Sequence, residues 1–347
     1  MTMTAPLLIT MGDAAGIGPE IIAKAFRDAP SDMRGCVVVG DVPTLRRASA
    51  LVARPLAQPV TVLEVLADWM SIPPGSIGVL QCCTLPGLVP FGVVSAAAGQ
   101  AAADCIAWAA RAVLGREAAA IVTAPIHKEA LSAAGGWAAA FPGHTELLQS
   151  EAATYSGKRL AQVPVRMMLA NDELKTVLVS IHMSLRQAIE AVTFDNVLET
   201  LRITHVAVSA SLGRPPRIGV AGLNPHAGEG GLFGSEERLV IAPAIAAAVA
   251  EGIDARGPFA PDTVFMRGRN VPGKAGEFDV VVAMYHDQGL IPVKYLGVEQ
   301  GVNVTLGLPL VRTSPDHGTA FDIAGTGKAD ASSLLAAIRM ARQLAYL

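Results

Sequence analysis

The stretch that decides the fold is FDVVVAMYHDQGL, residues Phe278–Leu290. The run from Val280 to Val282 is apolar without alternation, which is typical of a parallel strand covered on both faces. The sequence then turns polar and places His286 and Asp287 directly after the strand. Rigid elements hold site residues to closer tolerance than loops do. The stretch therefore predicts a buried strand that serves as the mount of a functional site.

Other short apolar runs alternate with helical patterns along most of the chain, which predicts an α/β fold with a mostly parallel core. The expected strands are Leu7–Met11, Cys36–Gly40, Ala119–Thr123, Thr176–Ile181, Arg217–Gly222 and Asp279–Met284. Two stretches, SAAGGWAAAFPGHTE and VEQGVNVTLGLP, are plausible crossings between domains. We therefore expect a discontinuous first domain, 1–135 plus 300–347, and a second domain, 136–299.

Composition excludes several classes of protein. The net charge of −3 and the lack of a basic cluster argue against nucleic acid as a partner. No apolar run reaches the roughly 18 residues that a membrane span needs, and the N-terminus lacks the pattern of an export signal. Cys36, Cys82, Cys83 and Cys105 form no C-x-x-C pair, so we interpret them as small core residues. These features predict a reduced, cytoplasmic protein with no membrane partner.

Histidines follow several of the expected strands. His182 ends VLVSIH, His226 ends VAGLNPH and His286 ends VVVAMYH. The carboxyl ends of parallel strands meet at one edge of a sheet, so these imidazoles should converge. Three imidazoles with an acid such as Asp287 suit a divalent cation like zinc, cobalt or nickel. Ordinary hydrogen-bonded loop histidines remain the alternative, because the spacing matches no local metal motif.

A second set of residues suits an anion. FPGHTELL places His144 and Thr145 between a Pro-Gly turn and a helix, where Thr145 could cap the helix and free N–H groups could meet a phosphate. An ordinary helix cap is the alternative. Lys294 and Arg312 are cations in apolar sequence surroundings, so each needs either a structural acid or an anionic substrate as partner.

Two glycine-rich stretches are candidates for a nucleotide-binding site. MGDAAGIGPEI, which begins at Met11, lacks the third glycine of the dinucleotide fingerprint and carries Glu20 where a pyrophosphate would lie. It therefore fails as a Rossmann motif. DHGTAFDIAGTGKAD, residues 316–330, predicts a loop that could hold an adenosine with Asp322 near a ribose; a glycine-capped turn is equally compatible with it.

Taken together, these motifs resemble those of the 4-hydroxythreonine-4-phosphate dehydrogenase family. The matching segments run in family order from Gly12 to about Gly325, and they are GDAAGIGPEI, TAPIHKEAL, FPGHTELL, VLVSIH, LNPHAGEGGLFGSEE, YHDQGLIPVK and GVNVTLGLPLVRTSPDHGTAFDIAG. The resemblance implies a two-domain fold like that of isopropylmalate dehydrogenase, with mostly parallel sheets and an active-site cleft between the domains. It also implies a homodimer whose active site is shared between subunits.

The resemblance also implies roles for particular residues. The implied metal ligands are His182, His226 and His286, with His286 coming from the other subunit. The implied substrate contacts are His144, Thr145, Lys294, Asn303 and Arg312. The implied acids near the metal are Asp262 and Asp287, with Lys294 as a further catalytic candidate. The implied cofactor loop includes Gly318, Thr319 and Asp322, and an acid near the ribose favours NAD over NADP.

The implied reaction is an NAD-dependent oxidation that also needs a divalent metal such as Zn, Co or Mg. The C3 hydroxyl of 4-phosphohydroxy-L-threonine would become a 3-keto acid, which loses carbon dioxide to give 3-amino-2-oxopropyl phosphate in pyridoxal phosphate synthesis. Ala14 and the GGLFG stretch at Gly230–Gly234 depart from the family pattern, so D-threonate or D-erythronate 4-phosphate remains an alternative substrate. A metal-dependent hydrolase or lyase without NAD, and a catalytically silent binding protein, are rivals from other classes.

Overall fold

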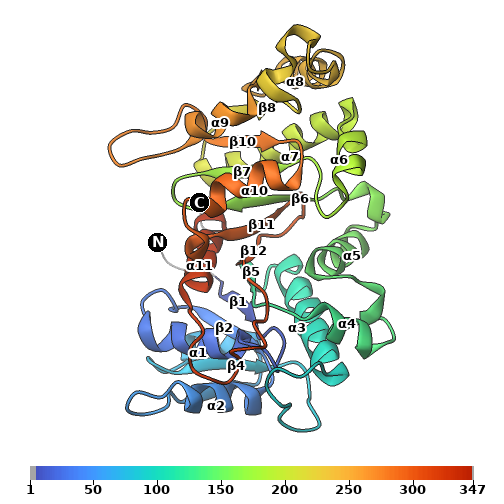
Figure 1. Ribbon diagram of the computed structural model, residues 1–347. Helices are drawn as coiled ribbons and strands as arrows, with labels where there is room; N and C mark the ends of the chain where they lie inside the picture. The colour runs from blue at the N-terminus through green and yellow to red at the C-terminus, as the bar shows by residue number, and fades with distance from the viewer. Residues whose placement is uncertain (1–4, 346–347) are drawn as a thin grey trace. The chain divides into compact units, whose positions relative to one another are not determined.

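Figure 1 shows a computed structural model of the chain, in which residues 5–345 are described. The described residues divide into two compact units. Residues 5–164 and 308–345 form unit 1, and residues 165–307 form unit 2. Both units combine strands with helices, which confirms the predicted α/β class. The predicted domain boundaries remain a prediction.

Unit 1 takes its strands and helices from both ends of the chain. Its elements are β1 (Leu7–Thr10), α1 (Gly18–Asp28), β2 (Cys36–Gly40), α2 (Val42–Leu51), β3 (Val60–Leu63), β4 (Ile77–Gln81), α3 (Ala96–Leu114), β5 (Ala120–Thr123), α4 (Lys128–Ala134), α5 (His144–Ser156), β12 (Arg312–Pro315) and α11 (Ser332–Ala345). Parallel pairs join the strands in the order β3-β4-β2-β1-β5-β12. Helices α1, α2 and α11 lie on one side of these strands, with α3, α4 and α5 on the other (Figure 1).

Unit 2 has its own set of strands, in the order β11-β6-β7-β10-β8-β9. Its elements are β6 (Arg166–Ala170), β7 (Lys175–Leu178), α6 (Leu185–Ala191), α7 (Phe194–Leu212), β8 (Ile218–Ala221), α8 (Ala242–Ala250), β9 (Ala255–Phe259), α9 (Pro261–Gly268), β10 (Val280–Ala283), α10 (His286–Tyr295) and β11 (Val302–Leu306). Strands β7, β10, β8 and β9 pair in parallel, whereas β6 is antiparallel to both β7 and β11. The prediction of a mostly parallel core is therefore confirmed.

All six predicted strands are present. The prediction for β2 matches both of its ends, while β7 ends at Leu178, three residues before the predicted end at Ile181. Because the chain leaves the sheet early, His182 lies in a loop rather than at the tip of a strand. Within residues 5–345, no helix combines the length and apolar character that crossing a bilayer requires.

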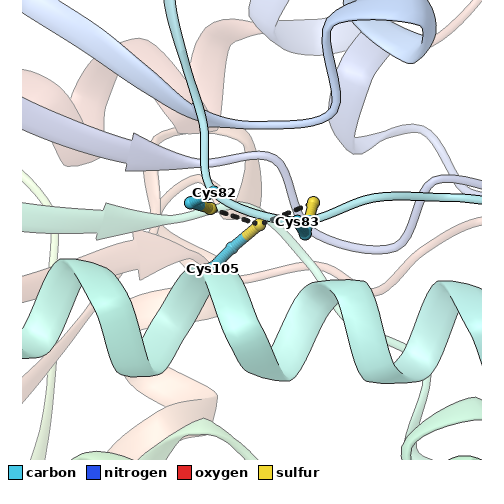
Figure 2. A group of neighbouring side chains, drawn as sticks. All are labelled: Cys82, Cys83 and Cys105. Carbon is cyan, nitrogen blue, oxygen red and sulfur yellow. Dashed lines mark hydrogen bonds between the residues drawn. The ribbon is translucent and has the colours of Figure 1, made fainter. Parts of the chain in front are cut away.

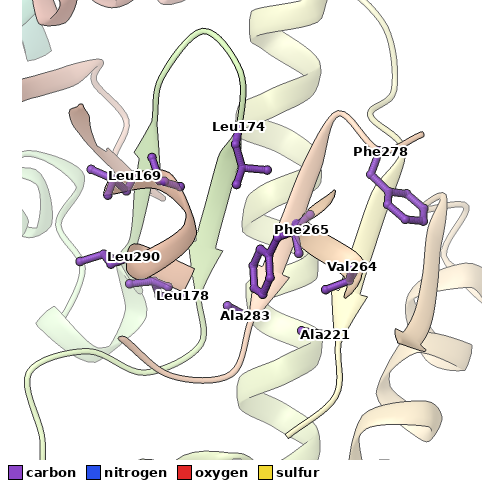
Figure 3. Close-up of a cluster of buried hydrophobic side chains, with 11 residues drawn as sticks. Leu169, Leu174, Leu178, Ala221, Val264, Phe265, Phe278, Ala283 and Leu290 are labelled. Carbon is purple, nitrogen blue, oxygen red and sulfur yellow. The ribbon is translucent and has the colours of Figure 1, made fainter. Parts of the chain in front are cut away.

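The core of unit 2 is built around Phe278, which is fully buried (Figure 3). It belongs to a cluster that includes Val281 of β10, Phe265 of α9 and Leu290 of α10. A Cβ atom on Gly219 of β8 would lie 2.6 Å from the Phe278 ring. Because only glycine leaves room for the ring there, this contact sets how β10 packs beside β8.

The start of β10 is held by a buried carboxylate. Asp279 has a side chain only 10% exposed and accepts hydrogen bonds from Arg214 at 2.8 and 2.9 Å. It also accepts one from the backbone N–H of Arg217 at 2.8 Å and others from the guanidinium of Arg217. Burial alone would raise the pKa of Asp279, but the hydrogen bonds from Arg214 and Arg217 lower it well below its usual range.

Asp279→Asn should therefore destabilise the protein at neutral pH. We expect the free energy of unfolding to fall by about 2 kcal/mol, because charged hydrogen bonds to a buried group are lost. The folded-state pKa lies below the unfolded value of about 3.9, so this contribution is present above about pH 4 and disappears as the pH falls through the folded-state pKa. Thermal unfolding of both proteins across that pH range measures the difference.

The matched control is Glu277→Gln. Glu277 lies two residues before Asp279, and its exposed carboxylate pairs with Arg267. Exposed ion pairs contribute little to stability. The assigned role of Asp279 would be contradicted if both substitutions lowered the free energy of unfolding equally. It would also be contradicted if Asp279→Asn lowered the free energy of unfolding by the same amount at all pH values.

Candidate active site

Three histidines follow three neighbouring strands of unit 2. β10 lies between β7 and β8 and runs parallel to both. His182 lies in the loop after β7, His226 lies in the turn segment Pro225–Gly231 after β8, and His286 begins α10 after β10. The three side chains therefore follow the carboxyl ends of adjacent strands, where ligands bind in open parallel sheets.

Two of these three rings lie together. The ring centroids of His182 and His286 are 5.5 Å apart, whereas His226 has Phe233 as its ring neighbour at 6.2 Å. Among the residues that the structure describes, the ligand atoms of the three histidines do not all lie within 4.8 Å of one another. One chain in this structure thus places the rings of His182 and His286 near each other, but it does not gather all three predicted metal ligands within 4.8 Å.

The backbone at two of the histidines is left-handed. His182 has φ of 45° and His226 has φ of 53°, and φ stays positive from His226 to Gly230. Such values are rare for residues other than glycine and tend to occur at functional sites. The carboxylate of Glu237 holds the segment before His226 by accepting the N–H groups of Leu223 and Asn224 at 2.8 and 2.7 Å. The strained loop is therefore anchored by a buried acid.

His286 is oriented by its neighbours. Its Nδ1 lies 2.7 Å from Oδ1 of Asp287, which leaves Nε2 for another partner. A carboxylate in this position fixes the tautomer of histidines that bind metals. Gln288 accepts the N–H of Met284 at 2.7 Å and donates to the carbonyl of Gly222 at 2.8 Å, so it ties the ends of β10 and β8 together.

The chemistry of this histidine group fits a divalent cation of the zinc type. Imidazole nitrogens with a carboxylate behind one of them are typical of such sites. Asp262, the other predicted acid, lies in the first turn of α9 with an exposed side chain. No described hydrogen bond links Asp262 to the three histidines.

Unit 1 contains a buried cationic group. Arg312 is 4% exposed at the start of β12, and its Nε and Nη2 donate to Oγ1 of Thr123 at 3.1 and 2.7 Å. Burial lowers the pKa of Arg312 to about 10, which the charge of Glu146 partly offsets. Burial and the charge of Arg312 lower the pKa of His144 well below its usual range, so this imidazole is neutral at pH 7.

The start of α5 differs from the prediction. Gly143 is the residue before the helix, and Thr145 already lies in its first turn. The predicted role of Thr145 as the helix cap is therefore wrong. Both His144 and Thr145 are half-buried, and Nε2 of His144 is buried without a hydrogen-bond partner among residues 5–345. A buried ring nitrogen of this kind can serve a ligand.

The other two predicted substrate residues belong to unit 2. Asn303 is half-buried on β11, and Lys294 is exposed in the last turn of α10. Lys294 is thus exposed in this chain, whereas Arg312 is buried. Lys294 lies on α10, the same helix that begins at His286.

The predicted cofactor residues Gly318, Thr319 and Asp322 lie in an irregular loop, as expected. The carbonyl of Thr319 accepts the N–H of Ile17 at 3.0 Å, and a Cβ on Gly16 would lie 2.9 Å from Thr319. The glycine-rich start of the chain thus provides close packing for this loop. Gly16 is thus required by packing against Thr319, and the glycines of residues 11–21 need not follow the spacing of the dinucleotide fingerprint.

Sequence reasoning gave no role to two residues beside this loop. Asp13, after β1, is 1% exposed, and its Oδ2 lacks a hydrogen-bond partner among the described residues. Burial raises the pKa of Asp13. His127, after β5, stacks on Phe321 with ring centroids 4.4 Å apart. Both follow adjacent parallel strands, and that position was the signal available in the sequence.

Comparisons with known proteins agree with this architecture. Residues 32–341 match the family model described as pyridoxal phosphate biosynthetic protein PdxA. A 4-hydroxythreonine-4-phosphate dehydrogenase of Beijerinckia indica is 52% identical over 98% of this chain and 95% of its own. A D-threonate 4-phosphate dehydrogenase of Pectobacterium atrosepticum is 43% identical over 99% of this chain and 100% of its own.

Solved structures agree as well. The crystal structure of a 4-hydroxythreonine-4-phosphate dehydrogenase from Klebsiella pneumoniae superposes with a TM-score of 0.85, at 42% identity, over 99% of this chain and 100% of that one. Similarity at this level of coverage extends over both units. The chain belongs to the pyridoxal phosphate biosynthetic protein PdxA family.

Proposed function

We propose that the protein is an NAD-dependent dehydrogenase that oxidises the C3 hydroxyl of 4-phosphohydroxy-L-threonine with the help of a divalent cation. The 3-keto acid formed would lose carbon dioxide to give 3-amino-2-oxopropyl phosphate. The names of the relatives support dehydrogenase activity. The observation that carries the proposal is the set of three histidines that follow the carboxyl ends of the adjacent parallel strands β7, β10 and β8.

His182, His226 and His286 would hold the cation. A bound divalent cation supplies positive charge that lowers the pKa of a hydroxyl group beside it. Asp287 keeps Nδ1 of His286 occupied, which presents Nε2 to the site. Gln288 keeps the loops after β8 and β10 at a fixed separation. Lys294 and Asp262 are proposed to act in proton transfer and in charge balance.

Arg312, His144 and Thr145 would bind an acidic group of the substrate, together with Asn303. The buried guanidinium of Arg312 provides a fixed positive charge in a medium of low dielectric constant, where it attracts an anion strongly. The neutral imidazole of His144 can donate or accept a hydrogen bond without adding charge. We assign Gly318, Thr319 and Asp322 to the nicotinamide cofactor, and the exposed carboxylate of Asp322 favours NAD.

We also propose that two copies of the chain associate through unit 2 and share their histidine sites. Each histidine has an exposed apolar neighbour: Met183 beside His182, Phe233 near His226, and Ile291 on the helix that His286 begins. Exposed apolar side chains that gather around a site are typical of an interface. In the proposed dimer, each site takes His182 and His226 from one chain and is completed by the partner's His286.

The catabolic alternative keeps the same chemistry on D-threonate or D-erythronate 4-phosphate. Relatives named for D-threonate 4-phosphate, at 43–44% identity, support this alternative. The 52% identity to a relative named for 4-hydroxythreonine 4-phosphate favours the first substrate. A hydrolase or lyase without NAD has no support among the names of these relatives.

The proposed activity is tested by measuring NADH formation with each of three substrates: 4-phosphohydroxy-L-threonine, D-threonate 4-phosphate and D-erythronate 4-phosphate. We expect 4-phosphohydroxy-L-threonine to give the highest kcat/KM. Prior treatment with EDTA should lower the rate by about 100-fold or more, and added zinc or cobalt should restore it. Preference for a sugar-acid phosphate would make the enzyme catabolic, and lack of NADH with all three would refute the proposal.

Arg312→Lys should raise KM for the phosphorylated substrate by roughly 10- to 100-fold, because the forked guanidinium contact to an anion is lost. KM for NAD should change little. The matched control is Arg267→Lys, a half-buried arginine of unit 2 that pairs with Glu277 and lies over the Phe259 ring. A thermal midpoint close to that of the unmodified protein would show that Arg312→Lys remains folded, and an unchanged KM in that folded variant would exclude this role.

Mixing two inactive variants tests the shared site. In the proposed dimer, chains carrying His182→Ala and chains carrying His286→Ala form mixed dimers with one intact site. Equal mixing should restore about a quarter of the activity per chain, since half of the dimers are mixed and each has one of two sites intact. If subunits demonstrably exchange and no activity returns, His182 and His286 act within one chain.

A further inference from the structure

Three cysteine side chains of unit 1 gather at one point (Figure 2). Cys82 and Cys83 follow the end of β4, and Cys105 faces them from α3. The Sγ atoms of Cys82 and Cys105 are 3.4 Å apart, and those of Cys105 and Cys83 are 3.6 Å apart. All three sulfur atoms lie within 4.8 Å of one another. Among residues 5–345, no other group of histidine, cysteine or acidic side chains is gathered this closely.

The surrounding structure keeps the three sulfur atoms in place. Cys105 is fully buried and Cys83 is 7% exposed, while Cys82 is partly exposed. The side chain of Gln81 donates to the carbonyl of Cys83 and to Oδ1 of Asp41, which holds the chain after β4. The site is therefore organised before any ligand arrives, and Cys82 provides the access from solvent.

The charges nearby favour a cation over a redox reaction. The charged groups that act on these thiols are acids, Asp104 near Cys82 and Asp41 near Cys83. Cysteines that react with oxidants usually lie in electropositive surroundings. An electronegative pocket attracts a metal cation instead.

We propose that Cys82, Cys83 and Cys105 form a thiolate site for a cation of the zinc type, separate from the histidine group of unit 2. Zinc–sulfur bonds of about 2.3 Å in tetrahedral geometry put sulfur atoms roughly 3.8 Å apart, close to the separations observed here. A disulfide would need two of these atoms to approach to about 2.05 Å. Three protein ligands leave the fourth position for water on the side of Cys82.

Binding replaces thiol protons with the metal and releases them to the solvent. The bound cation would join the end of β4 to the middle of α3, two consecutive elements linked by residues 82–95. Unit 1 should then gain stability from metal, because a ligand that binds only the folded state stabilises it. This inference does not depend on the reaction proposed above.

The test is a titration of the reduced, chelator-treated full-length protein with Co²⁺, followed by displacement with Zn²⁺. Cobalt bound to thiolates shows a sulfur-to-metal charge-transfer band in the near ultraviolet, which histidine ligands do not produce. We expect this band to appear in the unmodified protein and to disappear on addition of Zn²⁺. The dissociation constant for cobalt, measured from this band, should rise by about 100-fold in Cys82→Ser, because one of three ligands is lost.

Cys36→Ser is the matched control, since Cys36 is a buried cysteine of the same unit whose sulfur contacts Asp32 and Arg342 and lies outside the group. It should leave the band unchanged. X-ray absorption of the zinc-loaded unmodified protein gives an independent measurement that needs no variant, with sulfur neighbours expected about 2.3 Å from zinc.

Three results would overturn the proposal. One is a titration that saturates without the charge-transfer band, which would mean that only the histidine group binds metal. Another is a band that persists unchanged in folded Cys82→Ser. The last is conversion of the thiols to a disulfide by peroxide with no metal bound beforehand, which would identify a redox pair instead.

Discussion

The packing of the Phe278 ring against Gly219 fixes β10 beside β8, and the histidine group depends on that contact. β10 is the strand between β7 and β8, so its position along the sheet sets the distances among all three histidine-bearing loops. The salt bridges of Asp279 hold one end of β10, and Gln288 holds the other. The geometry of the site is therefore decided by buried contacts on both sides of a four-residue strand.

The apolar strands of the core could be predicted from the sequence because both of their faces are covered, which requires apolar residues at every position. Among the strands that were not predicted, β12 and β9 lack such an apolar run. β12 reads RTSP and β9 reads ARGPF, with charged residues and proline in strand positions. Such segments form strands because a neighbouring strand offers backbone partners, and a local pattern does not reveal that neighbour.

The same limit explains what could be predicted of the site. Position at a strand end identified His182, His226 and His286, but the close approach of His182 to His286 depends on β7 ending at Leu178. Cys36, Cys83 and Cys105 are buried core residues as expected, whereas Cys82 is partly exposed. Their gathering could not be foreseen, because it depends on which face of α3 packs against the end of β4.

The thiolate group and the histidine group differ in what brings their metal ligands together: folding of unit 1 for the first, and the proposed association of subunits for the second. The thiolate group is complete within unit 1 and mostly buried, so its affinity for metal is coupled to the folding of that unit. In the proposed dimer, the histidine group is completed only when two subunits associate, so its affinity for metal would be coupled to protein concentration. Dilution should therefore release metal from the histidine group first, while unfolding of unit 1 is needed to release it from the thiolates.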